Sequence, residues 1–556
     1  MFEGLNAKVA ESAVGRWFRL DGSGHPKQRE GSLFTTELRA GTTTFFAMAY
    51  IIAVNASILS DSGGTCVCES TADDPICLNN EAYALCKEIV RRDLITTSAA
   101  VAALASVLMG FFANLPVALA PGLGLNAYFA YSVYSLRDGS SSSSLCSESG
   151  TQWLARIIPR SLTLATGAGI GLFIALIGLG SAGLGVVGGD YTNLVGLGGC
   201  TAEYRDPEHP NYCLSHVLRS PTMWLGIFVG GIFTTLMLLY RVRGAIILGI
   251  LLVSIISWPR TTPVTLFPHT AVGDSNFDFF KKVVTFHKLE KIGNALDYNY
   301  AKGQVWIALI TFLYVDLFDT TGTLYSMAKF SGVMNPRTRD FEGSTVAYMV
   351  DAFSISMGAL MGTSPVTAFI ESATGISDGG KTGITAIVAG LCFFVSVFFA
   401  PIFASIPGYA TGGALVLVGS LMIKNVVDIN WSYIGDAVPA FLTLIIIPFT
   451  YNIAYGLITG IITYVLLNTL PWAIRRLSGR RISPPGYEDE REPWSIPEDG
   501  IFPLWMRKLA RGDRRFWTDD EDYNFGDNNS VRSRKTADEG ADSTDKTSEE
   551  VEKARV

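Results

Sequence analysis

Three acidic residues stand in runs of sequence that are otherwise apolar. Asp316 and Asp319 lie within residues 312–322, and Glu371 ends the run 362–371. Residues three apart share one face of a helix, so Asp316 and Asp319 are expected on the same side. A charge at the centre of a bilayer costs at least ~2.5–3.5 kcal/mol. Because neither run contains a basic residue, none of these acids is expected to face lipid.

Such carboxyl groups suit two kinds of chemistry. An enclosed carboxyl can take up and release a proton, and it can accept two hydrogen bonds from the N–H groups of a neutral heterocycle. The structural alternative is that an acid only caps a facing helix, and it applies most to Asp319. We predict that Asp316 and Glu371 bind a substrate and that all three acids take part in proton coupling.

Proline interrupts the chain at two apolar places. Residues 114–126 and 362–371 each contain a Pro-Val pair, which begins at Pro116 and Pro365. Proline disfavours helix in the residue before it, so each stretch is interpreted as a short strand followed by a half-helix. Unpaired backbone groups are costly in hydrocarbon, so such breaks persist where protein buries them or where they line a cavity. Paired interrupted segments indicate the binding site of a transporter. Two proline kinks with ordinary packing are the alternative.

Further candidates flank these acids. Asn126 could cap the first half-helix or form hydrogen bonds with a substrate, and Gly124 allows close backbone approach. Phe369 could stack on a planar ligand or pack in the core. The same two roles are open for Phe45 and Phe46, whereas Gly167, Gly169 and Gly171 are expected to pack helices.

The hydrophobic pattern must place these residues in membrane spans. The chain has 556 residues, of which 49% are hydrophobic and 17% charged, whereas an average soluble domain is ~25% charged. A crossing helix needs about 20 mostly apolar residues. Spans are predicted at 37–59, 95–113, 161–187, 222–240, 244–258, 304–328, 344–362, 384–406, 411–427, 433–449 and 452–473. The short segments 121–135 and 366–377 bring the intramembrane pieces to about thirteen.

Charges and cysteines orient these spans. Basic clusters at 241–243, 329–339 and 475–481 should face the cytoplasm, although Arg91 and Arg92 argue the other way. Two groups of cysteines crowd polar loops, which predicts disulfides on an oxidising, exoplasmic side. These groups are Cys66, Cys68, Cys77 and Cys86, and Cys200 and Cys213. A zinc site at Cys66 and Cys68 is the alternative.

The chain divides into five parts on this basis. They are a cytoplasmic segment 1–36, a first transmembrane repeat 37–258, an exoplasmic loop 259–303, a second repeat 304–473 and a cytoplasmic tail 474–556. The tail has too few apolar residues to form a core, so disorder is expected there.

Other function classes are disfavoured. None of the five histidines falls in a predicted span, so no Ser–His or metal constellation is expected there, and an enzyme is not predicted. No metal and no organic cofactor is expected. The net charge of −7 gives no argument for nucleic acid.

Five stretches together resemble one family. They are residues 37–51, 120–129, 166–172, 316–322 and 362–372. The sequence resembles a fungal AzgA-type purine permease, within the wider nucleobase–ascorbate and xanthine–uracil permease superfamily. The resemblance implies an all-α polytopic protein with an inverted 7+7 repeat, in which a core domain moves against a gate domain.

The same resemblance implies a function and a set of essential residues. It implies proton-coupled uptake of hypoxanthine, adenine and guanine across the plasma membrane, with both termini in the cytoplasm. It places the essential residues on Gly124, Asn126, Asp316, Asp319 and Glu371, and the superfamily suggests homodimers.

One departure from the family pattern concerns the first repeat. Residues 137–152 are too polar to cross a membrane, although the family carries a full span there. We therefore expect one span to be missing, which leaves an inactive truncated variant as an alternative. An anion transporter of the same architecture is another alternative, and the intramembrane acids argue against it.

Overall fold

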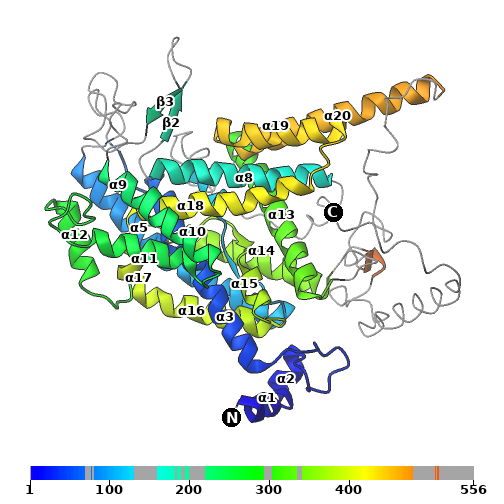
Figure 1. Cartoon of the computed structure of the whole chain (residues 1–556), viewed down its shortest axis with the longest axis horizontal. Coiled ribbons are helices and arrows are strands. Elements are labelled where there is room, and N and C mark those ends of the chain that lie inside the picture. Colours follow the sequence, from blue (N-terminus) through cyan, green and yellow to red (C-terminus); the bar gives the residue numbers. More distant parts are fainter. Residues whose placement is uncertain are drawn as a thin grey trace, which may run out of the picture.

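A computed structural model of the chain describes residues 2–68, 77, 80–130, 159–181, 185–188, 195–198, 220–293, 303–334, 341–479, 507–508 and 510–512. Within these residues the protein is a helical bundle with two small two-stranded sheets (Figure 1). Seven helices there are long and apolar enough to cross a membrane, and three shorter apolar helices accompany them. The prediction of a polytopic helical membrane protein is confirmed.

One group of elements, which we call the core bundle, packs around helix α5 (Glu81–Leu108) and the π-helical turn that follows it, Met109–Ala113. Helix α5 contacts α4 (Tyr50–Asp61), α14 (Ser344–Leu360) and α16 (Gly383–Ser396), and α16 also contacts α3 (Phe34–Met48). Two interrupted segments complete the core bundle. They are β1 (Leu119–Pro121) with α6 (Leu123–Tyr128), and β4 (Val366–Ala368) with α15 (Ser372–Ser377).

A second group, which we call the gate bundle, is centred on α8 (Arg160–Ser181). Helix α8 lies beside α18 (Gly408–Met422) and α19 (Ile434–Thr450), and α19 packs on α20 (Ile453–Leu477), as Figure 1 shows. The π-helix η6 (Trp224–Gly230) contacts α18 and is followed by α10 (Gly231–Leu239) and α11 (Ala245–Ser257). Helix α13 (Gly303–Ser331) contacts β4 and α15 on one side and α8 and α20 on the other, so it lies between the bundles.

The two interrupted segments meet in the interior. Strand β1 pairs antiparallel with β4, with Ala120 opposite Thr367. The ladder continues where the Gly122 N–H donates to the Pro365 carbonyl at 3.0 Å. The Ser106 hydroxyl bonds both backbone groups of Leu119 at 3.0 Å. The backbone groups freed by the breaks are therefore satisfied by protein, as a break inside a membrane requires.

Glycines bring the helices of each bundle together. A Cβ at Gly171 would lie 2.8 Å from the Gly419 carbonyl oxygen of α18, and one at Gly169 would lie 2.7 Å from Ile447 of α19. The predicted packing role of these glycines is confirmed, because any side chain there would push α8 away from its neighbours.

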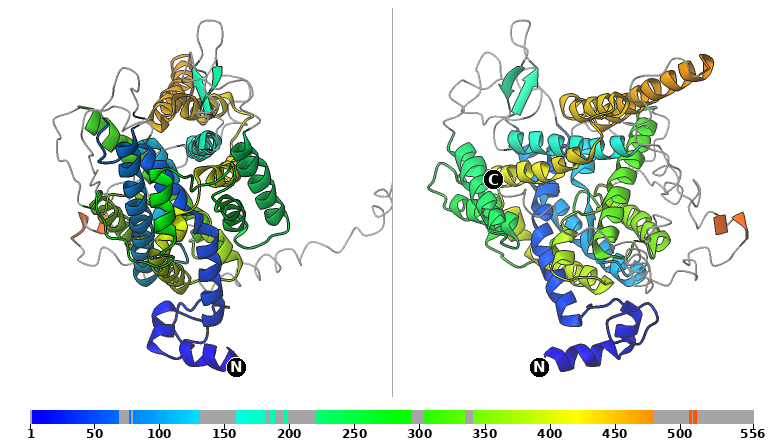
Figure 2. Two further views of the ribbon diagram at one scale, coloured as in Figure 1. Left: turned by 90° about the vertical axis from the view of Figure 1, so that its left-hand side faces the viewer. Right: turned by 45° about the vertical axis from the view of Figure 1, so that its right-hand side comes forward.

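The end of α8 differs from the prediction. The third span was expected to continue to residue 187, but α8 ends at Ser181, and β2 (Gly185–Gly188) pairs with β3 (Val195–Gly198). Glycine disfavours helix and valine favours strand, and this stretch consists largely of these two residues. The hairpin lies at the opposite end of the molecule from the N-terminal helices (Figure 2).

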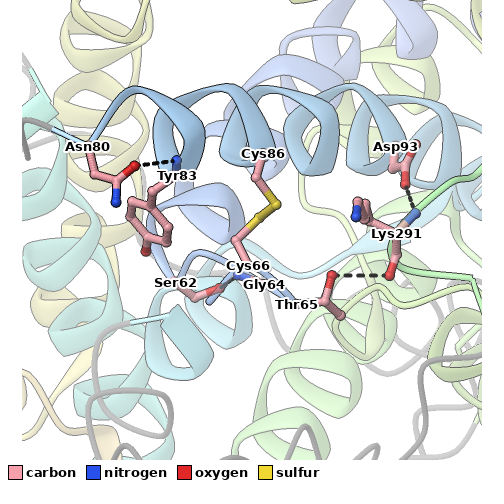
Figure 3. The surroundings of a disulfide bond; sticks show 9 residues. All are labelled: Ser62, Gly64, Thr65, Cys66, Asn80, Tyr83, Cys86, Asp93 and Lys291. Atoms are coloured by element: carbon pink, nitrogen blue, oxygen red, sulfur yellow. Dashed lines mark hydrogen bonds between the residues drawn. A yellow bond between two sulfur atoms is a disulfide. The ribbon is translucent and has the colours of Figure 1, made fainter. Parts of the chain in front are cut away.

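Two disulfides lie at the connection between α4 and α5, and one of them ties this connection to α5. They join Cys66 to Cys86 and Cys68 to Cys77, and Figure 3 shows the first of them. The predicted disulfides are thus present for these four cysteines, although Cys86 lies within helix α5 rather than in a loop.

The same end of α5 holds the segment that follows α11. Asp93 is fully buried, and its carboxylate accepts from the backbone N–H groups of Glu290 and Lys291 at 3.0 and 2.7 Å and pairs with His287 at 2.8 Å. Arg92 bonds Asn276 of the short helix α12 (Ala271–Phe280), and Arg91 donates to the Ile406 carbonyl. These two arginines are therefore engaged in contacts with neighbouring segments.

The N-terminal segment folds against the opposite end of the core bundle. Its helices are α1 (Phe2–Ala10) and α2 (Ala13–Phe18). The Arg29 guanidinium donates to the Asn114 carbonyl at 2.8 Å and pairs with Glu342, and burial lowers the pKa of Arg29 to about 10. A buried arginine in these contacts fixes the segment to the ends of α5 and α14.

Several predictions fall outside the described residues. They concern the missing span at 137–152, the pair Cys200 and Cys213, and nearly all of the tail 474–556.

Candidate functional site

A cavity of about 270 Å³ lies between the two bundles. This volume is close to the ~300 Å³ lower end of the range for small-molecule sites. The core bundle contributes α6 and the segment from β4 to α15, the gate bundle contributes α8 and α18, and α13 closes the remaining side. The cavity therefore sits where the interrupted segments of the core face the gate.

The charged groups that line this cavity are all acidic. They are Asp319 of α13, Glu371 before α15, and Asp428 at the end of the 3-10 helix η8 (Ile423–Asp428) that follows α18. No Lys, Arg or His is among the described residues of its lining. The rest of the wall is mostly apolar, with Ile170, Phe369 and Met422 among its members. Such a site favours neutral ligands with N–H groups, or cations, over anions.

Glu371 has one engaged and one free carboxyl oxygen. The Tyr50 hydroxyl donates to its Oε1 at 2.7 Å, whereas its Oε2 is buried and has no hydrogen-bond partner among the described residues. Tyr50 is the first residue of α4, which follows α3 after the single residue Ala49, and it is fully buried. The sequence interpretation missed Tyr50, although a tyrosine in an apolar run needs a partner for its hydroxyl, and that requirement was the available signal.

Asp319 and Asp316 lie in different surroundings although they share a helix face. Asp319 lines the cavity, and Glu371 and the Thr367 hydroxyl face its carboxyl group. Asp316 does not line the cavity and is almost fully buried. Its Oδ1 accepts from the Thr320 hydroxyl at 3.4 Å, and its Oδ2 has no hydrogen-bond partner in the part of the chain that the structure describes.

A fourth enclosed acid, Asp351 of α14, was missed by the sequence interpretation. It is fully buried, and its carboxyl oxygens have no hydrogen-bond partner within the described ranges. It lies close to Asp316 and to the Thr320 hydroxyl. The signal was available, because Asp351 is an acid in a predicted apolar span like Asp316. The enclosed acids thus form a second group behind the cavity wall.

Some of the remaining residues predicted for the site line the cavity, and others do not. Gly124 and Phe369 line the cavity, and a Cβ at Gly124 would lie 2.7 Å from Ile170. Asn126 is fully buried and does not line the cavity, and the described residues offer no hydrogen-bond partner to either polar atom of its side chain. Phe45 packs edge-on against Phe393 and is not part of the lining.

Comparisons with known proteins agree with this architecture. Residues 142–459 match the Permease family, Xan_ur_permease. An Aspergillus versicolor protein named efflux pump notK' is 57% identical over 539 residues, which are 93% of each chain. The guanine/hypoxanthine permease PbuO of Bacillus subtilis is 31% identical over 462 residues, which are 80% of this chain and 93% of PbuO.

A solved structure supports the fold. The murine Solute Carrier 26 family member A9 anion transporter, in its inward-facing state, aligns with a TM-score of 0.50 and 10% identity over 78% of this chain and 68% of that one. At this identity the likeness concerns the fold alone. The chain has the 7+7 inverted-repeat fold with short strand breaks.

Proposed function

The chain belongs to the xanthine/uracil permease family of membrane transporters, and we propose that it carries purine nucleobases across the plasma membrane together with protons. The proposed substrates are hypoxanthine, adenine and guanine, and the proposed direction is uptake. The observation that carries this proposal is the cavity between the bundles, which is lined by three carboxyl groups and mostly apolar side chains. A flat heterocycle with N–H donors suits such a site.

The residues have distinct proposed roles. Glu371 and Asp319 accept hydrogen bonds from the base, Phe369 covers its ring, and Gly124 lets α6 approach α8 at the cavity wall. Asp316 lies behind the cavity wall and is proposed to affect substrate binding indirectly, by fixing the position of α13. Protons are carried by Asp316, Asp319 and Glu371.

The orientation of the chain in the membrane is proposed from its two ends. The N-terminus is proposed to be cytoplasmic, because the N-terminal segment and the disulfides lie at opposite ends of the core bundle. The C-terminus is proposed to be cytoplasmic as well, because α20 ends in basic residues, which favour that side. A homodimer is also proposed. Oxidising conditions favour the disulfide side as exoplasmic.

The central test is uptake of radiolabelled hypoxanthine in a host that lacks its own purine uptake. Glu371→Gln should abolish uptake, because Tyr50 donates to one side of the group and the new amide would present N–H groups to the base. Glu81→Gln, at the exposed start of α5, is the matched control and should transport normally. Normal uptake by Glu371→Gln at equal surface level would remove this residue from the mechanism.

Coupling and direction need a separate measurement. Uptake should fall as external pH rises and should collapse with a protonophore, because the proton is a co-substrate. Uptake that is indifferent to both would indicate facilitated diffusion. The relative named as an efflux pump favours export as the second candidate. Export would be recognised by faster loss of preloaded hypoxanthine and no gain in uptake.

A further inference from the structure

An ion pair joins the two bundles at the end of the molecule that carries the N-terminal segment. Arg243 lies in the connection between α10 and α11 of the gate bundle. Its Nη2 lies 2.5 Å from Oδ1 of Asp378, which ends α15 in the core bundle. The same connection meets the core again at Gly244, where a Cβ would lie 3.3 Å from the Cβ of Phe46 in α3. The ion pair therefore lies on the surface where the gate meets the core.

The core bundle holds Asp378 in position for this pair. The Thr43 hydroxyl of α3 donates to Oδ2 of Asp378 at 2.7 Å, and the Arg39 guanidinium donates to the Asp378 carbonyl at 2.9 Å. The Asp378 side chain is only 10% exposed, whereas that of Arg243 is 56% exposed. A largely buried carboxylate that loses its partner is left with an uncompensated charge. Separation of the bundles at this point therefore has a cost on the core side.

The cavity reaches solvent at the same end of the molecule. Gly171 of α8 lies against Gly419 of α18. Gly178, farther along α8, lies against Gly412, so the two helices run antiparallel. The lining includes the beginning of α8 and continues past the end of α18 to Asp428, which is exposed. The other end of α8 contacts β2 of the hairpin, which lies opposite the N-terminal helices (Figure 2). The cavity thus opens at the end proposed to be cytoplasmic.

We infer that the pair of Arg243 and Asp378 is a latch, which holds the two bundles in the arrangement whose cavity opens to the cytoplasm. Alternating access in secondary transporters is largely a movement of one bundle against the other. Such a movement separates side chains that meet across the bundle surface, so the ion pair stabilises the arrangement in which it is formed and not the opposite one. The latch acts on the movement itself and does not depend on which substrate is carried.

The size of the effect follows from the exposure of the pair. Ion pairs that are partly exposed contribute up to about 1 kcal/mol, which corresponds to roughly fivefold in an equilibrium constant. Removal of the pair should therefore change the ratio of the two arrangements by about fivefold. Because this ratio is the quotient of two populations, at least one of them must then change by about twofold or more.

The test measures both populations with a cysteine in the cavity. Gly322 lines the cavity, and a Cβ there would meet nothing within 4 Å, so Gly322→Cys places a reporter thiol without a clash. A membrane-impermeant maleimide is applied to intact cells or to inside-out vesicles, and mass spectrometry follows the rate at which the peptide that contains residue 322 is modified.

Two variants in this reporter background remove the pair from either side. Arg243→Gln and Asp378→Asn should each slow labelling from the cytoplasmic face and accelerate it from the outer face, with at least one rate changed by about twofold or more. Asparagine at position 378 keeps an acceptor for the Thr43 hydroxyl. The double variant should match the larger single effect, because both changes remove the same interaction.

Arg241→Gln is the matched control. Arg241 lies in the same connection and is exposed, but it forms no salt bridge with any described residue. This variant removes the same charge and should label like the reporter protein alone.

The outcomes decide the inference without a transport assay. Labelling rates within twofold of the reporter protein from both faces, in both single variants, would overturn the latch. Additive effects in the double variant would also overturn it, since they would show two independent interactions. Wild-type protein that carries no purine refutes the proposed function, whereas the labelling rates still decide whether the latch exists.

Discussion

The contact between Gly124 and Ile170 gives a prediction with a magnitude that follows from the structure. Gly124 lies on α6 of the core bundle and Ile170 on α8 of the gate bundle, and both line the cavity. In Gly124→Ala the new Cβ would lie 2.7 Å from Ile170 Cγ2. Carbon atoms pack at about 3.5–4.0 Å, so α6 and α8 must separate by roughly 1 Å at this point.

The expected effect follows from that separation. Overpacking by a methyl group typically costs about 1–3 kcal/mol, which corresponds to roughly 5- to 150-fold in a rate or an equilibrium constant. The displacement falls on the cavity wall and on the surface where the core faces the gate. The maximal rate of hypoxanthine uptake per surface molecule should therefore fall by at least about fivefold.

Gly322→Ala is the matched control for this change. Gly322 also lines the cavity, but it is exposed on α13, and a Cβ there would meet nothing within 4 Å. Alanine is favoured over glycine inside a helix by roughly 0.5–1 kcal/mol, so this variant should keep its uptake rate and be slightly more heat-stable after solubilisation. The reasoning fails if Gly124→Ala transports like the wild type, or if Gly322→Ala is impaired to the same extent.

Three further changes test other parts of the molecule. Asp351→Asn replaces an enclosed carboxyl beside Asp316 by an amide that takes up no proton, so the surface level should persist while the pH profile of uptake shifts; an unchanged pH profile would exclude Asp351 from coupling. Asp93→Ala removes three hydrogen bonds of a buried carboxylate, each worth about 1.5–3 kcal/mol as a bond to a charged group, and limited proteolysis should then cleave residues 281–293 sooner than in the wild type. Joint replacement of Cys66 and Cys86 by serine should lower the free energy of unfolding by about 2–4 kcal/mol, and with it the melting temperature. A melting temperature equal to that of the wild type would contradict this last estimate.

Much of the architecture could be predicted because its signals are local. A long apolar run defines a span wherever it lies in the chain, and the predicted ends agree with α13, α14 and α20 to within a few residues. The interrupted segments were also predictable, since proline acts on the residue beside it. Their pairing with each other was not, because the register of β1 against β4 joins residues that are almost 250 positions apart.

Contacts between side chains on different helices were harder to predict from the sequence. The bond between Tyr50 and Glu371 spans 321 positions, and no spacing rule connects residues on different helices. Asp351 is a different case, because it is an acid within a predicted apolar span, as Asp316 is, and was therefore predictable from the sequence. An acid in an apolar span should be singled out regardless of whether a neighbouring motif draws attention to it.

The division of the acids into two groups depends on what surrounds each turn of α13. A spacing of three residues correctly places Asp316 and Asp319 on one helix face, but that face does not have one neighbour along its length. At Asp319 it meets the cavity and Glu371, and one turn earlier it meets Asp351 of α14. An acid that touches the cavity can contact a base directly. The enclosed pair Asp316 and Asp351 has one hydroxyl donor beside it, that of Thr320, which bonds Asp316. One further proton would supply the donor that this pair lacks. Ligand contact and proton storage can therefore occupy successive turns of one helix, so that movement of α13 would affect both.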